Sequence, residues 1–326
     1  MQPNDMRFMH AAIALSDRGK GRTAPNPNVG CLIVRDGVIV GRGWTQPGGR
    51  PHAEARALQQ AADLARGACA YVTLEPCFHF SPRGPRCVDL LVQSGVKRVV
   101  IAARDPDPRT DGQSITFLRA HGITVDTGVL EDEAKRQMAG FFLRQTRGRP
   151  FVTLKLGLSL DGCIAMADGS SRWITGPAAR AHAHLERSRH EAILVGRGTW
   201  LADAPALDIR LAGLEQHAPQ RFLLGHGEGA PAGWTRLSAP DDIAHIPNVA
   251  YIMVEGGAQT AAAFLRADLV DRLLFYRAPV LMGGGRPALG DIGLESLAQS
   301  HGRWRLSDNR MFGDDRMEVY LRKRAG

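Results

Sequence analysis

The sequence has no long apolar segment, and we expect no leader peptide at its start. No apolar run in its 326 residues approaches the ~20 that are needed to cross a bilayer. The first five residues, Met1 to Asp5, have neither the basic nor the apolar region of a signal peptide. We therefore expect a cytoplasmic protein with no membrane partner.

Cysteine is scarce and odd in number. The five cysteines do not suit a disulfide framework, and they favour a reducing compartment and metal ligation. Three of them, Cys31, Cys69 and Cys163, have no obvious role and are predicted to be packed thiols.

Aromatic residues make up only 6% of the chain, and no segment interleaves them with basic residues. The net charge is +8, yet no dense run of lysine or arginine occurs. This pattern speaks against nucleic acid as a partner and favours anionic small molecules such as phosphorylated metabolites.

The length suits two domains, at roughly 100–200 residues each. Strands and helices alternate in the first half, Arg147–Pro150 has the composition of a linker, and a new strand begins after it. We therefore predict an α/β protein with domains at 1–147 and 148–326. The expected strands are 30–34, 38–41, 70–74, 98–102, 123–125, 151–156, 221–224 and 250–254, and the expected helices are 6–15, one that begins near Pro51, 87–93 and one that ends at 117–120.

The order His52-Ala53-Glu54, then Pro76-Cys77, then Cys87 is the most informative motif. One His and two Cys can supply three ligands to zinc and leave a fourth position for water, as in catalytic zinc sites. This H-x-E…P-C…C order is the signature of zinc-dependent nucleobase deaminases. Glu54 can stay off the metal and carry protons from water to the departing amine.

The alternative is that these cysteines are packed hydrophobic residues and that His-x-Glu is a chance pair. Local context favours the metal, because Pro51 precedes an Ala-rich helix and residues 70–74 form a strand that ends near Cys77. Nine residues separate Cys77 from Cys87, so the loop between them must fold back to close the site.

Recognisable motifs occur in both halves of the chain. In the N-terminal half they are Pro25–Cys31, Gly48–Glu54, Tyr71–Cys77 and Asp105–Pro108. In the C-terminal half they are Pro150–Lys155, Ser159–Gly162, Ser171–Thr175, Val195-Gly196 with Gly198-Thr199, Asp203, Pro205, Arg210 and Val254–Gly257. In these motifs and in their order, the chain resembles the bifunctional deaminase–reductase family of riboflavin biosynthesis along nearly its whole length, which makes the resemblance highly specific.

The resemblance implies a cytidine-deaminase-like domain followed by a dihydrofolate-reductase-like α/β domain. The first would remove the 2-amino group of 2,5-diamino-6-ribosylamino-4(3H)-pyrimidinone 5′-phosphate with Zn²⁺, and the second would use NADPH to reduce the ribosyl group. The product would be 5-amino-6-ribitylamino-uracil 5′-phosphate. The dimerising habit of both fold families also predicts a homodimer.

Two further residues of the deaminase half match the family and are expected to contact its substrate. Asn26 lies in a Pro-rich turn, where its amide can bond a pyrimidine edge or simply stabilise the turn. His79 follows Cys77 by two residues and matches a histidine of the family, so we expect it to approach the substrate. The alternative is an ordinary surface histidine in a loop.

In the reductase half, the resemblance implies two sets of binding residues. Cofactor contacts are expected at Gly157, Trp173, Thr199 and Asp203, and at Gly256 and Gly257, where a strand–helix turn can meet a pyrophosphate. Substrate contacts are expected at Ser171, Arg187, Leu207, Arg210 and Glu255, with the two arginines suited to a phosphate. The alternatives are a core position for Trp173, a solvated helix face for Arg187 and a loop charge for Arg210.

Two segments depart from the family pattern. The loop from Cys77 to Cys87 is one residue longer than usual and lacks the Gly-Arg-Thr run. Between Arg210 and Glu255 only 44 residues occur, Gly225-His226 replaces a polar Asp-Ser/Thr pair, and the next βα unit is predicted to be missing. A deaminase with a degenerate C-terminal binding or assembly module therefore stays open as an alternative to the two-reaction enzyme.

Overall fold

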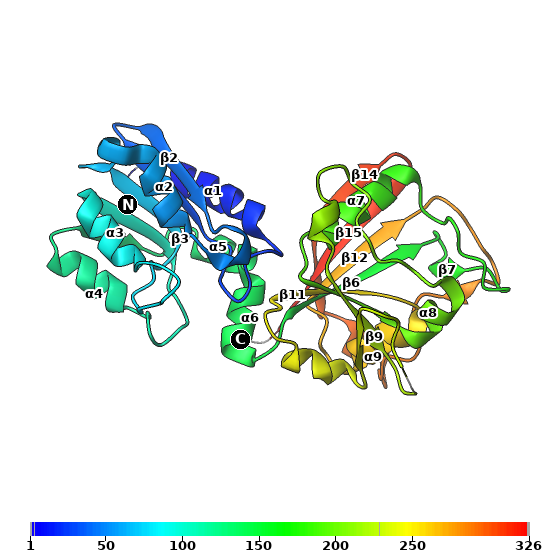
Figure 1. Cartoon of the computed structure of the whole chain (residues 1–326). Coiled ribbons are helices and arrows are strands. Elements are labelled where there is room, and N and C mark those ends of the chain that lie inside the picture. Colours follow the sequence, from blue (N-terminus) through cyan, green and yellow to red (C-terminus); the bar gives the residue numbers. More distant parts are fainter. Residues whose placement is uncertain (1, 3, 228, 325–326) are drawn as a thin grey trace. The chain divides into compact units, whose positions relative to one another are not determined.

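The computed structural model describes residues 2, 4–227 and 229–324. The chain divides into two compact units, Met1–Gly148 and Arg149–Gly326, which are described separately (Figure 1). The predicted linker is not wholly exposed, because Arg149 is buried and its guanidinium lies 2.7 Å from the Asp271 carboxylate of the second unit.

The first unit contains a five-stranded sheet. Its order is β2 (Val38–Trp44), β1 (Gly30–Arg35), β3 (Cys69–Leu74), β4 (Arg98–Ala103) and β5 (Thr124–Thr127). The pairs β2–β1 and β1–β3 are antiparallel, whereas β3–β4 and β4–β5 are parallel. The predicted 30–41 hairpin and the strands near 70, 98 and 123 are confirmed.

Helices cover both faces of this sheet (Figure 1). One face carries α1 (Asp5–Ser16) and α5 (Glu131–Gln137), and the other carries α2 (Ala53–Ala61), α3 (Cys87–Ser94) and α4 (Gln113–Ala120), with α6 (Ala139–Arg147) ending the unit. Glycines let two of the helices lie close to the strands. A Cβ at Gly30 would lie 2.0 Å from the Ala12 carbonyl oxygen of α1, and one at Gly43 would lie 2.0 Å from that of Ala53 in α2.

The second unit contains an eight-stranded sheet. Its order is β10 (Trp234–Leu237), β9 (Gln220–Leu224), β8 (Ala192–Gly196), β11 (Tyr251–Glu255), β6 (Phe151–Leu158), β12 (Arg272–Arg277), β15 (Asp315–Arg322) and β14 (Trp304–Phe312). The first six strands are parallel and the last two antiparallel. A separate two-stranded ladder joins β7 (Cys163–Ala165) to β13 (Arg286–Pro287).

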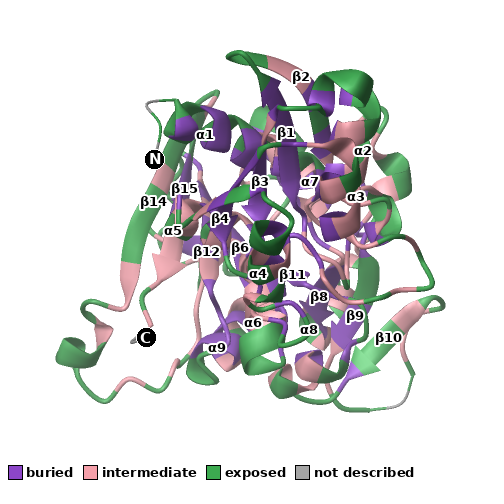
Figure 2. Ribbon diagram, turned by 90° about the vertical axis from the view of Figure 1, so that its left-hand side faces the viewer, coloured by how far each residue is buried: buried purple, intermediate pink, exposed green. Residues whose placement is uncertain are grey.

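Two apolar clusters lie on opposite faces of the large sheet. One includes Phe264 of α9 (Ala258–Arg266), and the other includes Ala179 and Ala183 of α7 (Pro177–Arg187). Figure 2 shows that β8 and β11 are buried throughout, whereas β14 is largely exposed. The parallel strands β6, β8, β9 and β11 therefore end at one edge, where ligands bind in open α/β sheets.

The segment between Arg210 and Glu255 corrects one prediction. The βα unit after β9 is reduced but not missing, because β10 pairs in parallel with β9 and a 3₁₀ helix spans Pro240–His245. In the described part of this segment no α-helix occurs. Gly225 directly follows β9, and a Cβ there would lie 3.0 Å from the Arg197 Cβ.

All five cysteines are free thiols. Cys31 and Cys163 are buried and Cys69 is half-buried, as predicted for packed thiols. Within the described ranges, the helices are too short or too polar to span a bilayer.

Candidate active sites

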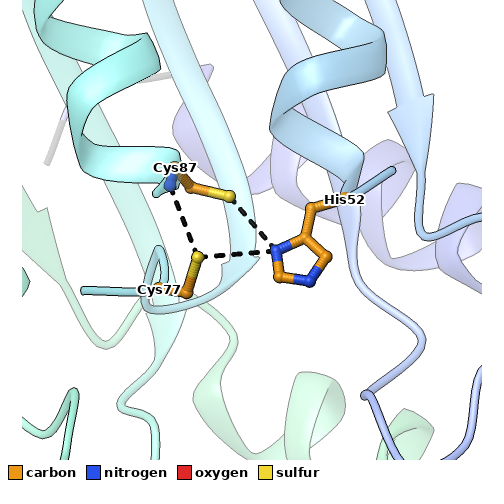
Figure 3. A group of neighbouring side chains, drawn as sticks. All are labelled: His52, Cys77 and Cys87. Carbon is orange, nitrogen blue, oxygen red and sulfur yellow. Dashed lines mark hydrogen bonds between the residues drawn. The ribbon is translucent and has the colours of Figure 1, made fainter. Parts of the chain in front are cut away.

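Three segments of the first unit bring the predicted zinc ligands together. His52 precedes the first turn of α2, Cys77 follows β3, and Cys87 is the first residue of α3. The His52 Nδ1 atom lies 3.3 Å from Cys87 Sγ and 3.5 Å from Cys77 Sγ (Figure 3). Helix N-termini favour negative charge, so the starts of α2 and α3 stabilise thiolates at this position.

The spacing of these atoms fits a zinc ion. Tetrahedral zinc with Zn–S of about 2.3 Å and Zn–N of about 2.0 Å requires N···S separations of about 3.5 Å. The three ligand atoms lie within 4.8 Å of one another, and Cys77 and Cys87 are buried. The residues therefore offer three of the four ligands of a catalytic zinc site.

The long loop between the cysteines folds back as predicted. It contains an isolated bridge between Ser81 and Gly84. Arg86 is held from two sides, because its Nε lies 2.7 Å from an Asp89 carboxylate oxygen and its guanidinium lies 4.3 Å from the centre of the Phe80 ring. These contacts fix the residue directly before Cys87.

The electrostatics suit metal ligation next to a proton carrier. Hydrogen bonding from Cys87 and His52 lowers the pKa of the Cys77 thiol to about 4. Glu54 is 3% exposed, and burial raises the pKa of its carboxyl. A raised pKa favours the protonated carboxyl, which suits a group that takes up a proton and passes it on.

A cavity of about 160 Å³ opens beside these residues. Of the predicted residues, His52, Glu54, Cys77, Asn26 and His79 line it. The Asn26 side chain donates to the Gly49 carbonyl, and its Nδ2 also lies 2.9 Å from His52 Nε2. Asn26 therefore contacts a ligand residue as well as the cavity, which turn chemistry alone does not require.

Four lining residues carry charge and were given no role from the sequence: Glu75, Asp105, Asp107 and Arg109. The Glu75 carboxylate accepts hydrogen bonds from the Gly112 and Asp105 amides, at 2.9 and 3.4 Å, and so holds their loop. Burial raises the pKa of Asp105 to about 7. The Asp105–Pro108 motif was the signal that could have found this loop.

The second unit contains a larger cavity, of about 740 Å³. Ten of the predicted reductase residues line it: Gly157, Ser171, Trp173, Arg187, Thr199, Asp203, Arg210, Glu255, Gly256 and Gly257. Leu207 is buried and lines an adjoining cavity of about 400 Å³ together with Ser171 and Arg210. Residues from six separate segments thus meet at the carboxyl edge of the parallel strands.

Two of the alternatives from the sequence are wrong. Trp173 is 62% exposed and not a core residue, and the Arg180 guanidinium lies 4.7 Å from its ring centre. Arg187 does not lie on a solvated helix face, because its side chain is 13% exposed and bonded to Glu255. Arg210 is 63% exposed, with its Nε 3.5 Å from Asp208.

Glycines shape the turn between β11 and α9. The Gly257 amide donates to Thr199 Oγ1 at 3.0 Å, which joins this turn to α8 (Arg197–Asp203). A Cβ at Gly196 would lie 2.0 Å from Thr260 Oγ1, so only glycine allows β8 to end against the first turn of α9. The uncapped start of α9 can receive a phosphate group.

Three further residues line the larger cavity and were not predicted as site residues: Lys155, Gln259 and Arg286.

Comparisons with known proteins match both units of the chain. Residues 2–103 match the cytidine and deoxycytidylate deaminase zinc-binding region, and residues 150–233 and 244–316 match the RibD C-terminal domain. The chain is 38% identical to the riboflavin biosynthesis protein RibD of Aquifex aeolicus over 91% of this chain and 92% of that protein. The chain belongs to the RibD family.

Solved structures of RibD proteins have the same fold. Acinetobacter baumannii RibD has a TM-score of 0.89 and 34% identity, and covers 98% of this chain and 99% of its own. A deaminase/reductase from Thermotoga maritima has a TM-score of 0.86 and 31% identity over the same shares. This RibD-family chain is thus a bifunctional enzyme of riboflavin biosynthesis, with a cytidine-deaminase-like domain followed by a reductase domain.

Proposed function

We propose that the first domain uses Zn²⁺ to deaminate 2,5-diamino-6-ribosylamino-4(3H)-pyrimidinone 5′-phosphate, and that the second uses NADPH to reduce the ribosyl group to ribityl. The observation that carries this proposal is the convergence of His52, Cys77 and Cys87 beside the buried Glu54. The same chain carries the family's reductase residues around one cavity.

In the deaminase domain, His52, Cys77 and Cys87 hold the zinc ion. When bound, zinc supplies the Lewis acidity that makes water nucleophilic at neutral pH. Glu54 takes a proton from the attacking water and transfers it to the departing amine, so that ammonia leaves and the C2 oxygen stays. Asn26 and His79 hold the pyrimidine ring by its polar edge.

In the reductase domain, Gly157, Trp173, Thr199, Asp203, Gly256 and Gly257 hold NADPH, which supplies a hydride. The cavity volume of about 740 Å³ is in the range of ordinary ligand sites, roughly 300–1,000 Å³. Ser171, Leu207 and Arg210 line the substrate side, where Arg187 keeps Glu255 in place. Lys155, the one lysine among the described lining residues, can donate the proton that accompanies the hydride.

We also propose a homodimer in the cytoplasm, with no nucleic acid partner. The edge strand β14 supports a second copy as partner, because Leu306 and Met311 on it are 49% and 61% exposed. An exposed edge strand with apolar side chains is a common site of chain pairing. Sedimentation analysis of the purified chain tests the dimer.

Three measurements on the purified chain test the function. Elemental analysis should give one zinc per chain, and less in Cys77→Ala. Ammonia should be released from the diamino substrate, and NADPH should be consumed only after deamination. Zinc content that is unchanged in Cys77→Ala would contradict the metal site. Ammonia release without NADPH oxidation or binding would favour a degenerate C-terminal domain.

A further inference from the structure

The deaminase cavity is too small to enclose a nucleotide. Its volume of about 160 Å³ is about half of the smallest ordinary ligand pockets, at roughly 300 Å³. It can enclose a pyrimidine ring beside His52 and Glu54, whereas a ribosyl phosphate must extend out of it. The exposed lining residues are Pro25, Arg109 and Gln145, and they mark the mouth through which that group passes.

Charge is distributed unevenly between the interior and the mouth. Four carboxyl groups line the cavity, those of Glu54, Glu75, Asp105 and Asp107, and all four residues are buried. Among the described lining residues, Arg109 is the one lysine or arginine, and its side chain is 65% exposed. The cationic side chain of the lining thus lies at the mouth, so an anionic phosphate is favoured there while the ring lies inside beside His52.

The Arg109 side chain is held in a defined orientation. Its Nε lies 3.0 Å from Asp107 Oδ1, its Nη2 lies 2.5 Å from Asp107 Oδ2, and its backbone amide also donates to Asp107. Asp107 thus occupies one edge of the guanidinium. The Nη1 group has no bonded acceptor within the described part of the chain and can donate to a ligand.

The other arginines near the cavity are committed elsewhere. Arg50 donates to the Pro85 carbonyl at 3.1 Å, and Arg83 donates to the Gly48 carbonyl. Neither residue lines the cavity. Arg104 precedes Arg109 by five residues, but its guanidinium pairs with the Asp111 carboxylate at 2.7 Å, and Arg104 does not line the cavity.

We propose that Arg109 binds the 5′-phosphate of the deaminase substrate and sets the preference of this site for a phosphorylated compound. The proposal rests on the proposed deaminase function. Arg109 acts at the mouth through a charge-assisted hydrogen bond, while Asp107 orients its guanidinium. It therefore affects substrate binding and not the proton transfers at Glu54.

The test compares two substrates, the proposed 5′-phosphate and the same compound after phosphatase treatment. Ammonia release by the full-length, zinc-loaded wild type should favour the phosphate. In Arg109→Gln, kcat/KM for the phosphate should fall about 10- to 100-fold through KM, and kcat/KM for the riboside should stay within about twofold. Arg109→Lys should retain part of the preference. Arg104→Gln is the matched control and should behave as wild type.

A second comparison separates phosphate binding from neutralisation of Asp107. If Arg109 only balances that carboxylate, the double variant Asp107→Asn/Arg109→Gln should regain the preference for the phosphate. We expect the double variant to stay deficient. Zinc content and thermal unfolding establish that each variant is folded.

The outcomes distinguish this proposal from the function on which it rests. A wild type that releases no ammonia from either compound overturns the proposed deaminase function. A wild type that prefers the phosphate, with the same preference in Arg109→Gln, overturns only the role of Arg109. Equal use of the two compounds by the wild type also overturns that role.

Discussion

Arg187 and Glu255 form a two-point ion pair in the reductase cavity. The Nε and Nη2 atoms of Arg187 lie 2.7 and 2.9 Å from the two carboxylate oxygens of Glu255. The residues are 68 positions apart, at the end of α7 and the end of β11. Burial acts to raise the pKa of Glu255, but Arg187 and Lys155 hold it far below its usual range. The Arg187 fork is thus satisfied within the protein, and Arg210 is the freer cation for a phosphate.

This pair predicts a strong effect on stability. Arg187→Ala should lower the free energy of unfolding of the second unit by about 3–5 kcal/mol, because Glu255 stays buried without its main partner. Lys155, 3.6 Å from Glu255, compensates in part. Urea unfolding followed by tryptophan fluorescence measures this, since four of the five tryptophans lie in that unit. A cost below about 1 kcal/mol, the range of an exposed pair, would contradict it.

Glu54 is expected to be essential for deamination but not for zinc binding. Glu54→Gln should keep zinc and fold while ammonia release falls about 10²- to 10⁴-fold, because an amide cannot carry the proton. NADPH oxidation with deaminated substrate provides an internal control and should be unchanged. Near-normal ammonia release by the zinc-loaded variant would exclude the assigned role.

Arg210 is expected to contribute to substrate binding in the reductase. Arg210→Ala should raise the KM for the deaminated substrate by about tenfold or more, because a charge-assisted hydrogen bond of about 1.5–3 kcal/mol is lost. Its 63% exposure predicts little change in stability. Steady-state NADPH oxidation measures the KM, and deamination by the same sample serves as the control. An unchanged KM would contradict a role in substrate binding and favour the alternative, that Arg210 is only a charged residue of a loop.

The Asp5–Arg98 pair predicts how stability depends on pH. Arg98 lies 2.8 Å from the buried Asp5 carboxylate and lowers the pKa of Asp5 to about 2. Because the folded pKa lies below the unfolded value of about 4, the contribution is full above about pH 4 and is lost as the pH falls toward 2. Asp5→Asn should therefore cost about 2–3 kcal/mol at neutral pH and clearly less at about pH 3. Urea unfolding at both pH values tests this, and a cost that does not change with pH would refute it.

The sequence by itself determined the domain order and the candidate metal ligands, which the fold brings together. The three candidate ligands lie at the start of a helix (His52 and Cys87) or shortly after a strand (Cys77). The sequence signals of these elements are local: a proline before a helix, a strand with β-branched residues and a short amphipathic helix. Such signals act over a few residues, so these elements can be predicted without knowledge of the fold. The strands β1, β3, β4, β6 and β9 were predictable for the same reason.

The tertiary structure decided which side chains meet. The order of strands in a sheet depends on contacts between distant segments, and no local period encodes it. Only that order joins Arg187 to Glu255, brings β10 beside β9, and places Leu207 and Ser171 around one cavity. The same holds for Arg109, whose place at the mouth of the deaminase cavity follows from Glu75 holding its loop across the edge of β3 and β4.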